Sequence, residues 1–163
     1  DAPFMARVGF PPDEADALGI YISTDPNADP NRQSYLPTDF RLMLIVDGYD
    51  YPTAIDRDMV ADPKGIETAG MSGYEQVLEG FEAAASETDQ GYIVEARIPF
   101  ASLANEQIAA LTPAPGMSVG FNVHLADLDM PCPGIASILL AWTGTDAITE
   151  VPAEWGVLEF RAR

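Results

Sequence analysis

The chain has 163 residues, 47% of them hydrophobic, so it is long enough to bury a core and too apolar to be disordered. Its 8 Lys and Arg residues against 26 Asp and Glu residues give a net charge of −18, which disfavours binding to nucleic acid and anionic lipid. No apolar run approaches the roughly 18–20 residues of a membrane helix, so no membrane insertion is expected. We expect a single acidic domain over residues 1–163.

The predicted elements are strands. Apolar and polar residues alternate in short runs between Gly and Pro breaks, which is typical of half-buried antiparallel strands. This pattern predicts strands at residues 3–10, 17–23, 38–47, 76–86, 91–98, 117–126, 137–143 and 155–161. Residues 23–39 and 50–75 are predicted to be irregular, and residues 102–111 a short helix. The predicted fold class is all-β: an antiparallel, jelly-roll-like β-sandwich of about eight strands.

The first irregular segment contains a candidate cation site. Asp25, Asn27 and Asp29 place oxygen-bearing side chains at alternate positions, as in the first half of an EF-hand loop, although the EF-hand glycine and distal glutamate are absent. The alternative is a pair of Asx-Pro turns that only solvate the loop. Asp127 and Asp129, at the end of the strand over residues 117–126, form a second candidate pair. Structural calcium is thus one prediction for this loop, and a pair of solvated turns is the other.

Catalytic motifs are absent from the sequence. Cys132 is the only cysteine, which excludes an intrachain disulfide, and a nucleophilic pair with the only histidine, His124, would need a third orienting group. Glycoside hydrolysis needs a pair of carboxylates, but among 26 acidic residues some pair always has a suitable spacing, so this signal is not specific. Phosphate-binding glycine loops and zinc-protease motifs do not occur. We therefore do not expect an enzyme.

Several segments, taken in order, resemble a known family. They are DALGIYIST (16–24), TDFRLMLIVDG (38–48), GYIVEARIPFASL (91–103), SVGFNVHLADLD (118–129), ILLAWTG (138–144) and EWGVLEF (154–160). Their joint order is similar to that of family 9 carbohydrate-binding modules, which belong to the DOMON-like β-sandwiches. The resemblance implies a non-catalytic, secreted or periplasmic domain of a larger protein that binds a sugar or glycan. It also favours calcium, which family members commonly hold.

The ligand site of the family is matched only in part. Two tryptophans sandwich the sugar in the family, and neither is present at its position here; Trp142 matches a structural tryptophan, and Trp155 is predicted to be a core or edge aromatic. The arginine of the family site is retained as Arg41, whereas its glutamate partner is Gly19. The resemblance thus implies Arg41 as a carbohydrate-binding residue. The alternative is a structural or protein-interaction β-sandwich in which the sugar site has been lost.

Two further expectations follow from the same resemblance. Other DOMON-like domains bind haem between a methionine and a histidine or lysine, so one of the six methionines with His124 or Lys64 is a second alternative. Family members also carry an N-terminal hairpin before the strand predicted at residues 3–10. Since none precedes it here, we expect a domain that is N-terminally incomplete relative to the family, with a partner segment completing the exposed sheet edge.

Overall fold

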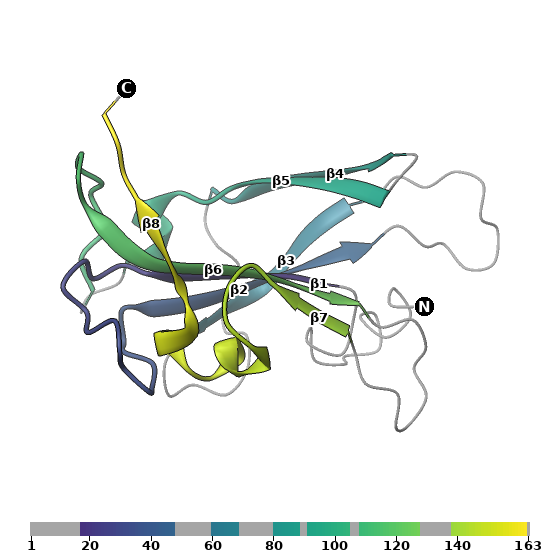
Figure 1. Cartoon of the computed structure of the whole chain (residues 1–163). Helices are drawn as coiled ribbons and strands as arrows, with labels where there is room; N and C mark the ends of the chain where they lie inside the picture. Colours follow the sequence, from purple (N-terminus) through teal and green to yellow (C-terminus); the bar gives the residue numbers. More distant parts are fainter. Residues whose placement is uncertain are drawn as a thin grey trace.

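The computed structural model describes residues 17–47, 60–68, 80–88, 91–104, 108–127 and 138–162. Its strands are β1 Ala17–Ser23, β2 Asp39–Asp47, β3 Val60–Thr68, β4 Glu82–Thr88, β5 Gly91–Arg97, β6 Ser118–Asp127, β7 Ile138–Ala141 and β8 Gly156–Glu159. Short 3-10 turns connect some of them: η2 Phe100–Leu103, η3 Asp146–Thr149 and η4 Pro152–Glu154. The all-β, antiparallel prediction is confirmed (Figure 1).

The strands form two layers. The larger sheet has the order β3-β2-β1-β6-β7, and β8 also pairs with β6. Because β8 pairs with residues 118–121 of β6 and β7 with residues 124–127, these two short strands share one side of β6. The β4–β5 hairpin forms the second sheet and lies over one face of the first (Figure 1). All pairs are antiparallel.

The face of the large sheet toward the hairpin is apolar. Alternation along β1 and β2 directs Ile20 and Leu42 to this face, with Val94 and Ile98 packed against them from the hairpin side. The buried core consists of Ile20, Ile22, Phe40, Leu42, Leu103, Ile108, Leu111 and Val119. Each such aliphatic or aromatic side chain stabilises the fold by about 1.5–3 kcal/mol through removal from water.

The opposite face of the same strands is polar but equally buried. Its buried side chains are Tyr21, Ser23, Asp39, Arg41, Asn122 and His124. The β1–β2 loop and the η3–η4 segment lie against this face, where Ile148 and Trp155 pack on Tyr21. We refer to the group Tyr21, Arg41, Asn122 and His124, together with Gly19, as the polar sheet face. A buried polar surface needs hydrogen-bond partners, so these contacts determine what the face can do.

Two expectations about local structure are wrong. The segment 50–75 was expected to be irregular, yet β3 lies within it; Pro63 and Gly65 hide the strand, and a register shift between Leu42 and Leu44 accommodates them at the sheet edge. The expected helix over 102–111 is also incorrect in the described residues, because η2 ends at Leu103 and residues 108–111 are not helical. Ten residues form a marginal helix at best, and core burial of Leu103, Ile108 and Leu111 decides the path instead.

The other predicted strands coincide with β1, β2, β5, β6, β7 and β8 to within a few residues, and the strand expected at 76–86 occurs as β4 at Glu82–Thr88. The strand expected at 3–10 lies outside the described residues.

Candidate functional site

The centre of the polar sheet face is a hydrogen-bonded tyrosine and histidine. Tyr21 lies opposite Asn122 in the β1–β6 register, and Gly19 lies opposite His124. The Tyr21 hydroxyl oxygen is 2.7 Å from Nδ1 of His124, and the two ring centroids are 5.3 Å apart. His124 is only 2% exposed. His124 is therefore a buried, hydrogen-bonded residue of the sheet.

The His124 ring explains why residue 19 is a glycine. A Cβ atom at Gly19 would lie 2.3 Å from Cε1 and 2.5 Å from Nδ1 of His124, far inside van der Waals contact. The imidazole therefore fills the space that a side chain on Gly19 would need. The glycine that replaces the family's glutamate at position 19 is thus explained by His124. The two residues are 105 positions apart in the chain, and the sequence alone did not reveal the contact.

Arg41, the predicted carbohydrate-binding residue, lies on this same face. It is opposite Tyr21 on β1 and Glu67 on β3, so it occupies the middle of the sheet and is 9% exposed. The structure brings Arg41, Tyr21 and His124 together on adjacent strands. A role of Arg41 in sugar binding stays a prediction.

Asn122 fastens the chain after β7 to β6. Its side-chain amide donates to the carbonyl oxygen of Thr143 at 3.0 Å, and its Oδ1 accepts from the Thr143 amide at 3.3 Å. This two-way bond replaces a backbone ladder where β7 has ended. Asn122 is therefore occupied by a structural role.

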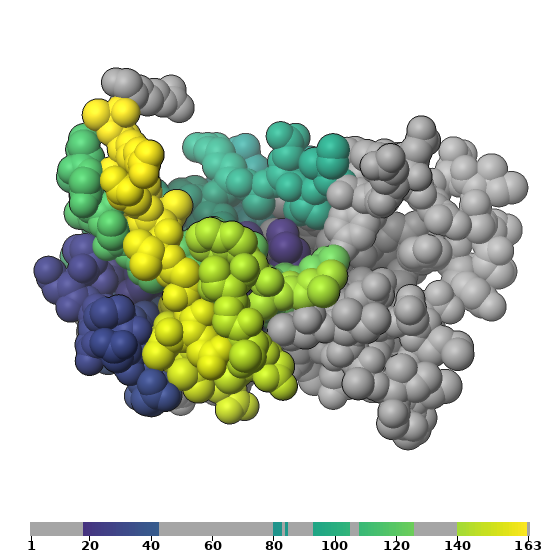
Figure 2. All heavy atoms as spheres, viewed as in Figure 1, coloured from purple at the N-terminus to yellow at the C-terminus, as the bar shows by residue number. Residues whose placement is uncertain are grey.

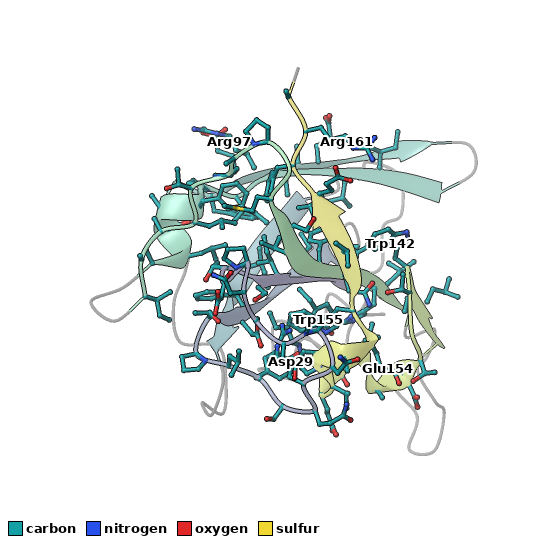
Figure 3. All side chains as sticks on the ribbon, turned by 60° about the vertical axis from the view of Figure 1, so that its left-hand side comes forward. Asp29, Arg97, Trp142, Glu154, Trp155 and Arg161 are labelled. Atoms are coloured by element: carbon teal, nitrogen blue, oxygen red, sulfur yellow. The ribbon has the colours of Figure 1, made fainter. Side chains whose placement is uncertain are left out.

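Trp155 closes the same face beside Tyr21, as the prediction of a core aromatic required. Its indole N–H donates to the Ile148 carbonyl oxygen at 2.9 Å, and the guanidinium of Arg32 lies 5.5 Å from its ring centroid. Figure 3 shows Trp155 between the sheet and the loops below it. Trp142, by contrast, lies on the surface, its ring edge-on to Phe121 at 6.1 Å.

Arg32 is held in place by a buried ion pair. Its Nε and Nη2 donate to the two carboxylate oxygens of Asp39 at 2.9 and 2.8 Å, and Asp39 is fully buried. The Leu36 amide donates to Oδ2 of Asp39 at 2.8 Å as well. A buried carboxylate is stable only with such partners, so the pair fixes the β1–β2 loop against the sheet.

The candidate calcium loop forms two Asx turns. Oδ1 of Asp25 accepts from the Asn27 amide at 2.8 Å, and Oδ1 of Asp29 accepts from the Asn31 amide at 2.9 Å. The second carboxylate oxygen of each aspartate and the side-chain oxygen of Asn27 are left as donors for a hard cation that keeps several waters. Within the described residues no group of three or more His, Cys, Asp or Glu side chains could hold a metal ion. Calcium at this loop stays a prediction.

The remaining predicted ligands cannot be compared with the structure. Asp127 ends β6, opposite Ile138, and its side chain lies outside the described part of the chain. Asp129 lies outside the described residues altogether. The haem alternative gains no support from the buried His124 with its bond to Tyr21. No described helix has the length and apolarity needed to cross a membrane.

Comparison with known proteins agrees with this fold. The family model described as "Carbohydrate family 9 binding domain-like" matches residues 13–162. The chain belongs to this family. A search of the curated proteins found no match.

Two solved structures show the same fold. Both are carbohydrate binding modules of family 9 from Caldicellulosiruptor kristjanssonii, one in complex with glucose and one with cellotriose. Each has a TM-score of 0.58; the identities are 16% and 17%, and each match covers 93% of this chain. The chain spans 62% and 60% of the length of those two chains. The family model over residues 13–162 confirms the suspected family, and these structures agree with its fold.

Proposed function

We propose that this domain is a non-catalytic carbohydrate-binding module that forms part of a larger, secreted or periplasmic protein. The observation that carries the proposal is the family match over residues 13–162, nearly the whole chain. The two similar structures, which hold glucose and cellotriose, point to β-linked glucose units as the first ligands to try.

The chemistry of the described residues is compatible with this role. Sugar recognition combines apolar or aromatic surface for the C–H face of the ring with charged and amide groups for its hydroxyls. The larger sheet and the loops against it carry charged groups in Arg41 and Arg32, and the exposed Trp142 and Val157 supply apolar surface.

Affinity electrophoresis at physiological salt tests the proposal. A protein of charge −18 migrates strongly in a native gel, so retardation by soluble β-glucan, xylan or galactan in the gel is easily measured against a gel without polysaccharide. Binding to an insoluble polysaccharide is tested by measuring how much protein insoluble cellulose removes from solution. No retardation and no depletion, with the β-fold verified by circular dichroism, would reject sugar binding and leave the structural or interaction role.

Export is tested separately. We expect the precursor to carry a cleavable leader, and the mature domain to appear in the medium or periplasmic fraction when the full-length gene is expressed. Retention of the full-length product in the cytoplasm would contradict this part of the proposal.

A further inference from the structure

A groove lies between the β1–β2 loop and β8, next to the polar sheet face. Its volume is about 200 Å³, and its lining residues come from three segments: the β1–β2 loop, the start of β6, and η4 with β8. Figure 2 shows the β1–β2 loop (dark blue) and the C-terminal segment (yellow) side by side on the surface. Arg41, Tyr21 and His124 do not line it, so it is distinct from the polar sheet face.

The walls of the groove are mostly apolar. They are formed by Pro26, Pro30, Pro152, Trp155 and Val157, and Gly120 on β6 supplies a floor without a side chain. A Cβ at Gly120 would lie 3.4 Å from Trp155 and 3.5 Å from Arg32, so glycine keeps the floor low. The Ala153 amide donates to the Arg32 carbonyl oxygen at 3.0 Å and ties the two sides together. A site that is built in advance loses little entropy on binding.

Two polar side chains of opposite character also line the groove. Arg32 has five N–H donors, of which Asp39 takes two and the Asp29 carbonyl oxygen one, at 3.0 Å. Among the described residues nothing accepts from the other two. Asp25 supplies an acceptor, because only its Oδ1 is occupied, by the Asn27 amide.

We propose that this groove binds one ring of a neutral sugar through Arg32 and Asp25. A hydroxyl accepts a hydrogen bond from the arginine, a neighbouring hydroxyl donates one to the aspartate, and the C–H surface of the ring packs on the prolines and Val157. The carboxylate in the groove and the charge of −18 favour a neutral ring over an acidic one. The inference rests on the proposed function and locates a binding site for it.

Val157→Asp is the decisive variant. Val157 is 62% exposed on β8, so the substitution should fold, and it places a charge in the apolar wall. Its matched control is Ile93→Asp on β5, where the residue is 54% exposed and outside the groove. Asp25→Asn is a second variant, since asparagine keeps the Asx-turn acceptor and loses the charge. Asp146→Asn, at an exposed position of η3, makes the same change of charge elsewhere.

Titration calorimetry with cellotriose, maltotriose and a galactotriose measures the effect. We expect Val157→Asp and Asp25→Asn to weaken the best ligand by about tenfold or more, and both controls to stay within about twofold. We expect a galacturonate trisaccharide to bind more weakly than its neutral counterpart. If the wild type binds a neutral trisaccharide and both groove variants bind it equally well, the groove is not the site, although the domain still binds sugar. If the acidic trisaccharide binds better, the neutral class is wrong. If the wild type binds none of them, the inference is overturned, and the gel and depletion tests described above decide the proposed function.

Discussion

The Gly19–His124 contact makes the sharpest prediction about this fold. Gly19→Ala adds a methyl group whose carbon would lie 2.3 Å from Cε1 of His124, so the imidazole must move. Overpacking of this kind costs about 1–3 kcal/mol. Moving the ring also breaks the bond between Tyr21 and His124, and the loss of this partner by two buried polar groups costs about 1–3 kcal/mol more.

One favourable contribution partly offsets this loss of stability. Replacing glycine by alanine in a strand is otherwise favourable by about 0.5–1 kcal/mol, because the unfolded chain loses freedom. We therefore expect Gly19→Ala to lower the free energy of unfolding by about 3 kcal/mol. For a domain of this size the melting temperature should fall by about 6–12 °C.

The assay is a double-mutant cycle measured by urea unfolding, with the buried Trp155 as the fluorescent reporter. In the background of His124→Ala the new methyl group enters the vacated space, so Gly19→Ala should be neutral or stabilising by up to about 1 kcal/mol. The coupling energy between the two sites should then reach about 3–4 kcal/mol.

Gly120→Ala is the matched control for the cycle. It also lies in the larger sheet, but its Cβ would meet Trp155 at 3.4 Å, an ordinary contact, and we expect its effect to stay within about 1 kcal/mol. Additive effects of Gly19→Ala and His124→Ala would refute the reasoning. So would a Gly19→Ala variant that is as stable as Gly120→Ala.

Two other predictions concern charges. Arg32→Met should lower the free energy of unfolding by about 3–5 kcal/mol, because it leaves Asp39 buried without its main partner. The control Arg97→Met removes a bond to Glu82 on the exposed surface of the hairpin and should lower it by less than about 1 kcal/mol. Equal urea midpoints for the two variants would contradict this. Millimolar calcium should raise the melting temperature of the wild type, and a chelator should lower it. The double variant Asp25→Ala with Asp29→Ala should lose most of that response. If sodium chloride at matched ionic strength gives the same shift in the wild type, the loop is only a pair of turns.

Local pattern explains why many of the strands were predictable. In β1 and β6 the apolar side chains that pack in the core alternate with the side chains of the polar sheet face, and this period of two is visible in the sequence itself. The Asx turns at Asp25 and Asp29 were foreseen as one of two alternatives for the same reason, since Asx-Pro turns depend on neighbouring residues only. The order of these local signals was also enough to indicate the family.

The sequence by itself thus determined the fold class, most strand positions and the turn-forming loop, because each depends on residues close together in the chain. Only the tertiary structure decided that Pro63 belongs to a strand, that Leu103 and Leu111 enter the core without the helix predicted over 102–111, and that His124 excludes a side chain at Gly19. It alone assembled the groove from Arg32 and Asp25 in one loop and Val157 at the far end of the chain. Such contacts depend on strand register and on which loops cross a sheet face, and these are set by long-range packing rather than by any local preference.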